Sequence, residues 1–260
     1  MPMITLHNVS KAFGDNRVLD GVSLNVEESE SRVILGGSGT GKTVLLKVVL
    51  GLLRPDNGSI FVDGAEVDLD EPLALFEIRK KIGMCFQMAA LFDSMTVTEN
   101  ISFGLSRHTP YSPSQIQSRV DECLSLVGLR GTGDLYPSEL SGGMKRRVGF
   151  ARAIALKPKI LLFDEPTTGL DPVMTDVISK VITDLRSELR ATTITITHDL
   201  KVAFMIGQNI SLLHRGSIAA SGNPLEFAAI QDPLVQQFIK GTSEGPFLVD
   251  SPPKRQRTLL

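Results

Sequence analysis

The 260-residue sequence contains no tryptophan and only two cysteines, Cys85 and Cys123. The two lie far apart in the chain, and neither has a histidine or another cysteine beside it. This spacing supports neither a disulfide framework nor a zinc site. We therefore expect both cysteines to be buried, small apolar side chains in a protein of a reducing compartment.

An excess of charge of either sign is also missing. The 27 Lys and Arg residues nearly balance the 29 Asp and Glu residues, which gives a formal net charge of −2. A chain with this balance is not attracted as a whole to nucleic acid or to an acidic membrane, so we expect no nucleic-acid partner. We interpret the acidic residues Asp68, Asp70 and Glu71 as part of a solvated loop.

Long apolar runs are absent as well. The longest, residues 44–53, has ten residues and is interrupted by Lys47, whereas a helix that spans a bilayer needs about 20. The first residues contain no basic segment followed by an apolar stretch, so no export signal is expected. We expect the chain itself not to span a membrane.

Apolar residues make up 42% of the chain and charged residues 22%, as in an ordinary globular domain. Short apolar runs predict strands before Gly36 and at residues 81–87, 159–164 and 192–197, and residues 172–189 have helical spacing. Strands that alternate with helices of this length imply an α/β fold with a parallel sheet covered on both faces.

Two other regions have a different pattern. Residues 4–33 and 58–67 alternate over short distances around turns, the second around Asp63-Gly64, and predict antiparallel hairpins. Residues 96–129 have helical spacing with a break at residues 108–114, which is typical of a helical insertion. Residues 241–260 are rich in Gly, Pro and charge and are interpreted as an extended tail.

The segment Gly36–Thr43 reads GGSGTGKT and matches the phosphate-binding loop G-x-x-x-x-G-K-[ST] between a predicted strand and a predicted helix. Its glycines let backbone N–H groups converge on phosphate oxygens, and the helix start adds positive potential. We expect Lys42 to hold the β- and γ-phosphates and Thr43 to offer its hydroxyl to Mg²⁺. The remaining cradle residues are Gly36, Gly37, Ser38, Gly39, Thr40 and Gly41.

A carboxylate pair follows the predicted strand at residues 159–164. Asp164 closes the apolar run Ile160–Phe163, and Glu165 comes next. Neighbouring side chains at a strand end point in different directions. We therefore expect Asp164 to anchor the metal ion and Glu165 to face the water that attacks the γ-phosphate.

A second candidate anion site precedes another helix. Ser141 is a good N-cap, and Gly142 and Gly143 leave backbone N–H groups unobstructed. The spacing alone leaves open whether this helix start and the phosphate-binding loop serve one nucleotide. Three arginines further along the helix are interpreted as a solvated or pairing face and not as a nucleic-acid patch: Arg146, Arg147 and Arg152.

Together these segments resemble the ATP-binding-cassette ATPases in order and spacing. The residues that carry the resemblance are Gly36–Thr43, Gln87, Leu140–Met144 (LSGGM), Ile160–Pro166 (ILLFDEP), Gly169–Asp171 (GLD) and His198. The resemblance implies a P-loop NTPase, or RecA-like, core with an antiparallel β subdomain. It also implies a helical subdomain at about residues 90–152, inside a single domain of residues 1–240.

The resemblance further implies a head-to-tail homodimer with two ATP molecules between its halves. Ser141–Gly143 of one copy would cover the γ-phosphate held by Gly36–Thr43 of the other, and Asp171 would cross the seam between them. Phe13 occupies the place where this family stacks an aromatic ring on adenine.

Roles within one copy follow from the same resemblance. Glu165 would polarise the attacking water, and His198 would contact the γ-phosphate from the far side. Gln87 would sense metal and water, and would thereby join Thr43 and Asp164 around Mg²⁺.

The chain length narrows the class of cassette ATPase. Only 122 positions separate Lys42 from Asp164, too few for the long coiled coils of chromosome-maintenance ATPases. A ribosome-acting member would carry two cassettes and a basic face. The expected function is the energy-coupling subunit of a membrane transporter, peripheral on the cytoplasmic face of the inner membrane and bound to a separate permease.

Three segments resemble the Mce-associated lipid-transport group, which includes the Mla phospholipid system. They are residues 86–103, LSGGMKRR with Met144, and residues 238–247. This resemblance implies phospholipid transport between bacterial membranes with an Mce-type lipid-binding partner. A transporter for another small solute, such as an amino acid or a metal, and a non-transport ATPase remain alternatives.

For two further segments the sequence allows two interpretations each. Leu91, Phe92 and Met95 form either a core loop or a docking surface for a partner helix. The tail residues Lys254 and Arg255, with Arg257, either pair with an acidic surface of a partner or remain solvated.

Overall fold

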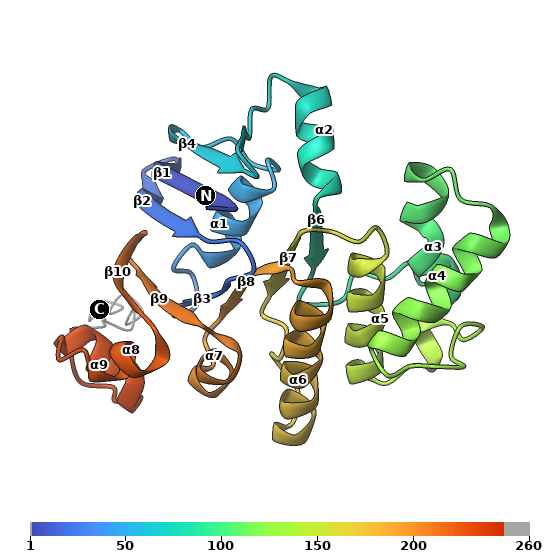
Figure 1. The fold of residues 1–260 in the computed structure, drawn as a ribbon. Helices are drawn as coiled ribbons and strands as arrows, with labels where there is room; N and C mark the ends of the chain where they lie inside the picture. The colour runs from blue at the N-terminus through green and yellow to red at the C-terminus, as the bar shows by residue number, and fades with distance from the viewer. Residues whose placement is uncertain (1, 247–260) are drawn as a thin grey trace, which may run out of the picture.

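The computed structural model describes residues 2–246, and most of the predicted tail, including Lys254, Arg255 and Arg257, lies outside these (Figure 1). The N-terminal part folds into an antiparallel sheet with the strand order β2-β1-β4-β5. Its strands are β1 (Ile4–Phe13), β2 (Asn16–Val26), β4 (Asn57–Val62) and β5 (Ala65–Glu66). The two predicted hairpin regions are thereby confirmed, the second with its turn at Asp63-Gly64.

A second sheet of six strands forms the centre of the molecule, in the order β10-β9-β3-β8-β7-β6. Its strands are β3 (Ser31–Leu35), β6 (Ile82–Cys85), β7 (Ile160–Asp164), β8 (Thr192–Thr197), β9 (Asn209–His214) and β10 (Ser217–Gly222). The strands from β9 to β6 are parallel, and β10 pairs antiparallel with β9. The predicted α/β fold with a parallel core and an antiparallel β subdomain is confirmed.

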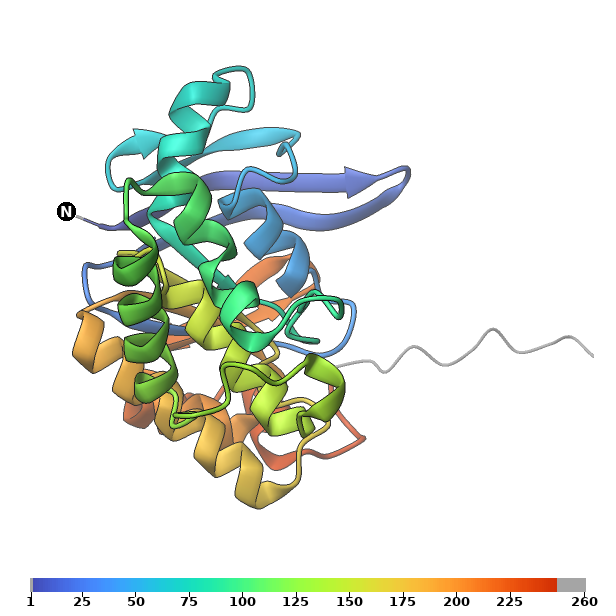
Figure 2. The ribbon, with the colours of Figure 1, turned by 90° about the vertical axis from the view of Figure 1, so that its right-hand side faces the viewer.

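Nine α-helices accompany the sheets within residues 2–246. They are α1 (Lys42–Val49), α2 (Pro72–Lys80), α3 (Val97–His108), α4 (Pro113–Leu126), α5 (Gly142–Ile154), α6 (Pro172–Leu189), α7 (Leu200–Ile206), α8 (Pro224–Ala229) and α9 (Pro233–Lys240). None of these helices has the length and apolar character that a bilayer crossing requires. Helices α3 and α4 lie beside α5 at one side of the molecule, where the sequence predicts the helical subdomain (Figures 1 and 2).

The break between α3 and α4 has a local cause. Each helix begins with a capping box, Thr96 with Glu99 in α3 and Ser112 with Gln115 in α4. In a capping box the side chain of the first residue accepts from the backbone N–H of the second, and the side chain of the second accepts from the backbone N–H of the first. The two boxes fix two separate helix starts, so the predicted interruption is confirmed.

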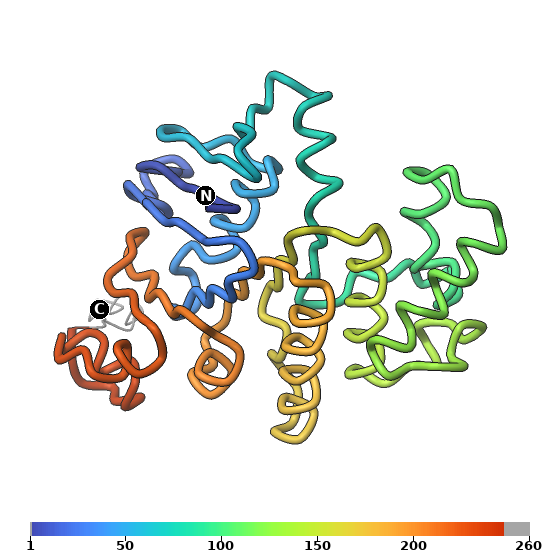
Figure 3. Tube along the Cα trace, in the orientation of Figure 1, coloured from blue at the N-terminus to red at the C-terminus, as the bar shows by residue number. Residues whose placement is uncertain are grey.

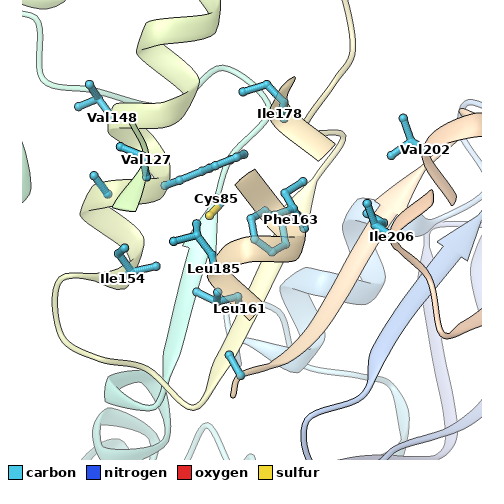
Figure 4. Close-up of a cluster of buried hydrophobic side chains, with 14 of the residues drawn as sticks. Cys85, Val127, Val148, Ile154, Leu161, Phe163, Ile178, Leu185, Val202 and Ile206 are labelled. Carbon is cyan, nitrogen blue, oxygen red and sulfur yellow. The ribbon is translucent and has the colours of Figure 1, made fainter. Parts of the chain in front are cut away.

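Alternating side chains of the central strands feed two apolar cores. In β7, Leu161 and Phe163 face the core that α5 and α6 cover, whereas Ile160 and Leu162 face the core shared with α1 and the antiparallel sheet. Figure 4 shows Phe163 surrounded by side chains such as Cys85 and Ile178. A central sheet covered on both faces is therefore confirmed.

The first predicted helix is shorter than its apolar sequence suggests. The periodic apolar residues run to Leu53, but α1 ends at Val49. Gly51 takes a positive φ of 62°, and the N–H groups of Leu52 and Leu53 turn back to the carbonyl of Lys47. The apolar residues after Val49 therefore lie in a tight turn.

The end of the described chain returns to the side of its beginning. The backbone trace in Figure 3 brings the orange strands β9 and β10 next to the blue N-terminal strands. The N–H of Asp20 in β2 donates to the carbonyl of Gly216, at 2.8 Å, in the turn between β9 and β10. This contact ties the antiparallel sheet to the edge of the central sheet.

Both cysteines are buried and unpaired, as expected. Burial raises the pKa of the Cys123 thiol to about 11 and also raises the pKa of Cys85. Because the thiolate is the reactive form, we expect neither thiol to react with Ellman's reagent at pH 8 in the folded protein, and both to react after unfolding. Release of one or two equivalents from the folded protein at the rate of a free thiol would contradict this.

Candidate active site

A cavity of about 350 Å³ opens where the parallel strands β3, β6, β7 and β8 end. Side chains and loops at the carboxyl edge of such a sheet come from segments far apart in sequence. The cavity is lined by Val18, Ser38, Gly39, Thr40, Gly41, Lys42, Thr43, Val44, Gln87, Glu165, Thr168 and His198. The structure thus brings most of the predicted site residues to one place.

The phosphate-binding loop is packed too closely for side chains at two of its glycines. A Cβ atom on Gly36 would lie 2.7 Å from the carbonyl oxygen of Leu213, and one on Gly41 would lie 2.7 Å from that of Val18. Gly41 also has φ +99°, a conformation that L side chains rarely adopt. These glycines allow the loop to pass between β2 and β9 and to turn its backbone toward the cavity.

Lys42 is buried at the base of the loop. Its ammonium donates to the carbonyls of Gly36 at 2.8 Å and Gly37 at 2.9 Å. It also lies 3.3 Å from Oε1 of Glu165. A buried cation is stabilised by such partners, so Lys42 holds the loop to the strand edge that carries the carboxylates.

Glu165 is held by groups from three elements. Its φ of +46° turns the chain directly after β7, and its N–H donates to the carbonyl of Ile196 in β8 at 3.0 Å. Oε2 of Glu165 accepts from the hydroxyl of Thr168 at 3.1 Å and lies 2.9 Å from Nδ1 of His198. This buried carboxylate therefore has one defined direction, toward the cavity.

Asp164, at the end of β7, faces Thr43 at the start of α1. The Thr43 hydroxyl donates to Oδ1 of Asp164 at 3.4 Å. Burial raises the pKa of Asp164, and neighbouring Glu165 raises it further, whereas the bond from Thr43 and the charge of Lys42 oppose the shift. The negative charge of Asp164 is thus not fully compensated by its neighbours, and a divalent cation bound there would stabilise it.

The donor atoms fit Mg²⁺ in type. A hydroxyl and a carboxylate are the hard oxygen ligands that this ion prefers, and Mg²⁺ usually completes its shell with water and phosphate oxygens. Within residues 2–246 no cluster of three or more His, Cys, Asp or Glu side chains forms a self-sufficient metal site. An ion at Thr43 and Asp164 would thus depend on a bound nucleotide for further ligands.

The raised pKa of Asp164 predicts a stabilising substitution. A carboxyl whose pKa is higher in the folded than in the unfolded protein costs stability as the pH rises through the folded value. We therefore expect Asp164→Asn to raise the melting temperature by about 2 °C at pH 7 in EDTA, with a smaller difference at pH 5. A variant less stable than the unsubstituted protein at pH 7 would contradict this assignment of charge.

The predicted site residues that do not line the cavity are Phe13, Gly36, Gly37, Ser141–Gly143, Asp164 and Asp171. Phe13, at the end of β1, is half exposed, and the ammonium of Lys11 lies 5.8 Å from the centre of its ring. Ser141 caps α5, where its hydroxyl accepts from the N–H of Met144 at 3.3 Å, and Gly142 beside it is exposed. Asp171 caps α6 and accepts from the N–H groups of two residues in its first turn, both at 2.9 Å.

Some features of the site were not predicted. Val18, Val44 and Thr168 line the cavity. The only sequence signal for Thr168 is its hydroxyl three residues after Glu165. The sequence predicted a solvated or pairing face for three arginines of α5 but not their partners, which are backbone carbonyls: Arg146, Arg147 and Arg152.

The comparisons with known proteins agree with this geometry. The profile of the family described as ABC transporter matches residues 19–168. The “Probable ribonucleotide transport ATP-binding protein mkl” of Mycobacterium leprae is 41% identical over 249 residues, which cover 95% of this chain and 72% of that protein. The intermembrane phospholipid transport system ATP-binding protein MlaF of Escherichia coli K12 is 38% identical, covering 94% and 91% of the two chains.

Solved structures have the same fold. CbiO1 of Clostridium perfringens, part of the ABC transporter complex cbiONQ, superposes with a TM-score of 0.82 at 30% identity, covering 92% of this chain and 95% of that one. The ATP-binding cassette MJ0796, as a dimer in a post-hydrolysis state with ADP and phosphate, superposes with a TM-score of 0.77 at 33% identity. The superposition with MJ0796 covers 85% of this chain and 99% of MJ0796.

Proposed function

This chain belongs to the ATP-binding-cassette family of transporter ATPases, and we propose that it drives a bacterial phospholipid transporter as its ATP-hydrolysing subunit. Residues 1–240 are proposed to form the cassette, with residues 90–152 as its helical subdomain. The observation that carries the proposal is the cavity in which the ammonium of Lys42 and the carboxylate of Glu165 lie 3.3 Å apart beside His198. The similarity to MlaF over 94% of the chain supports the cargo.

Binding of ATP is assigned to the loop and the helix that follows it. Residues Ser38–Gly41 line the cavity, and their backbone N–H groups, with the start of α1, are proposed to supply positive potential to the phosphates. Lys42, already buried there, supplies the positive charge opposite the β- and γ-phosphates. Phe13, whose ring is half exposed, is proposed to stack on the adenine.

Hydrolysis is assigned to the residues at the strand ends. Glu165, with His198 2.9 Å from its Oε2, is positioned to take the proton of the attacking water, and His198 then stabilises the γ-phosphate. Gln87 lines the same cavity from the end of β6 and is proposed to orient water. Mg²⁺, when held by Thr43 and Asp164 with Gln87, supplies charge neutralisation to the phosphates.

A second copy is proposed to complete each site. Ser141, Gly142 and Asp171 lie outside the cavity of their own chain, and the start of α5 offers backbone N–H groups to an anion. In a head-to-tail homodimer these residues would cover the nucleotide of the other copy. The dimeric cassette MJ0796, 33% identical to this chain, supports this arrangement.

A membrane permease is proposed to dock beside Gln87. Met88 and Phe92 are exposed apolar residues that follow it in the chain, and Phe92 packs on Phe103 of α3 with 4.8 Å between ring centres. Leu91 instead packs on the core. This surface would place the subunit at the cytoplasmic face of the inner membrane, as a peripheral protein with an Mce-type lipid-binding partner in the same complex.

The cargo is tested with the whole complex in proteoliposomes. In complexes with the unsubstituted chain, we expect ATP to drive transfer of a labelled phospholipid and phospholipid to stimulate ATP hydrolysis. Complexes with the Glu165→Gln variant are expected to show neither effect. The name of the mkl relative makes a ribonucleotide the second candidate cargo. Movement of labelled ribonucleotide without any response to phospholipid would overturn the lipid assignment and leave the ATPase assignment intact.

A further inference from the structure

Helix α5 is attached to three separate segments by three arginines. Each guanidinium donates to two backbone carbonyl oxygens of one segment; Arg146 and Arg152 use both terminal nitrogens, in the planar fork typical of arginine, and Arg147 uses one. The pairs are Arg146 with Pro166 and Thr168, Arg147 with Val127 and Gly128, and Arg152 with Ala89 and Ala90. Of these contacts, the one made by Arg146 reaches the loop that carries Glu165.

The loop after Glu165 connects Arg146 to the carboxylate. Arg146 donates to the carbonyls of Pro166 and Thr168. The hydroxyl of Thr168 donates to Oε2 of Glu165 at 3.1 Å, and His198 lies 2.9 Å from the same oxygen. Fixing the backbone of Thr168 therefore fixes one of the three groups that orient the carboxylate, beside His198 and Lys42.

Arg146 also lies near the start of α5. Arg146 lies about one turn beyond Gly142, close to the helix start that is proposed to cover the nucleotide of a second copy. There α5 contacts α6, since the side chain of Met174 lies against Gly143. Arg146 thus connects this end of α5 to the loop after Glu165 in the same chain.

We propose that Arg146 and Thr168 are positioning residues for Glu165, and that they link the start of α5 to the catalytic carboxylate of the same chain. The inference rests on the proposed role of Glu165. Arg146 acts on the backbone of the loop, and Thr168 transmits its position to the carboxylate by one hydrogen bond. Neither residue is proposed to touch the nucleotide of its own site through its side chain.

The first test compares Arg146→Met with Arg147→Met. Both variants keep the length of the side chain and remove two bonds to backbone carbonyls from the same helix, so both measure the general cost of loosening α5. We expect Arg146→Met to lower kcat by about 10- to 100-fold, the effect of misplacing a catalytic group by about 1 Å, with the KM and Kd for ATP unchanged. Arg147→Met is expected to keep kcat within about twofold of the unsubstituted protein.

Equal losses of kcat in the two arginine variants, at equal losses of melting temperature, would overturn the proposal. If Arg146→Met does not fold, the hydroxyl of Thr168 provides the second test. Thr168→Val keeps the branched shape and removes the hydrogen bond to Glu165, so kcat is expected to fall by a similar factor. Thr168→Ser retains the hydroxyl and is expected to restore most of the activity, and failure of this rescue would also overturn the proposal.

The double variant Arg146→Met, Thr168→Val shows whether Arg146 acts on Glu165 through Thr168 or independently of it. If Arg146 acts through Thr168, the double variant is expected to be no slower than Thr168→Val alone. Losses that multiply would overturn the link between the two residues. An unsubstituted protein without ATP hydrolysis would refute the proposed function itself, whereas an active Arg146→Met beside an active Arg147→Met refutes this inference alone.

Discussion

Replacing Glu165 with Gln is expected to lower ATP hydrolysis by about 10²- to 10⁴-fold, the contribution of a positioned general base, while ATP still binds. Gln keeps the shape of the side chain and its bond from Thr168, but it cannot take a proton from water. It also removes the negative charge 3.3 Å from Lys42. Phosphates would then meet less competition for Lys42, so we expect ATP affinity to be unchanged or higher.

The same variant is expected to accumulate as a dimer with ATP and magnesium, because closure without hydrolysis leaves the nucleotide in place. Size exclusion with light scattering measures the dimer, and phosphate release measures turnover. Glu30→Gln is the matched control, since Glu30 is also buried and paired, 2.8 Å from Arg32, but directly precedes β3 and does not line the cavity. Turnover in Glu165→Gln at the rate of Glu30→Gln would remove Glu165 from catalysis.

Most of the fold that positions the site follows from local sequence signals. The prediction for α6 and β8 matches their bounds because Asp171 and Pro172 define the helix start and because β8 is a continuous β-branched run. Lys42 and Asp164 could be placed together because parallel strands end at one edge of a sheet, whereas His198 was placed there by the family resemblance. The motif and the topology thus require the same arrangement.

The remaining elements had no comparable signal. Helices α7 and α8 have seven and six residues, too few turns for apolar periodicity to be visible. Strands β9 and β10 follow without a motif to mark them. The sequence therefore predicts the parallel core but not the C-terminal segment, which closes its edge.

The arginines of α5 show a different limit. A side chain that pairs with a carboxylate can be guessed from opposite charges in the sequence, but every residue has a carbonyl. Nothing in the sequence singles out Pro166 and Thr168 as partners of Arg146. Only the fold, which places α5 beside the loop after β7, gives Arg146 a role near the site.

Lys42→Ala is expected to weaken ATP binding by roughly 10- to 100-fold, which corresponds to the loss of a charge-assisted hydrogen bond of about 1.5–3 kcal/mol. Calorimetric titration with ATP and magnesium measures this change. Affinity within about threefold of the unsubstituted protein would show that the phosphates do not contact Lys42. The substitution has a second effect on the free protein, because it leaves Glu165 buried without the cation that lies 3.3 Å away.

These two effects of Lys42→Ala can be separated with one further variant. An unpaired buried carboxylate is costly, so Lys42→Ala alone is expected to lower the melting temperature of the nucleotide-free protein. Adding Glu165→Gln removes the uncompensated charge and is expected to restore much of that stability, but not the affinity for ATP. If the double variant regained affinity as well, Lys42 would act mainly by neutralising Glu165, and the phosphates would be held by the backbone of the loop.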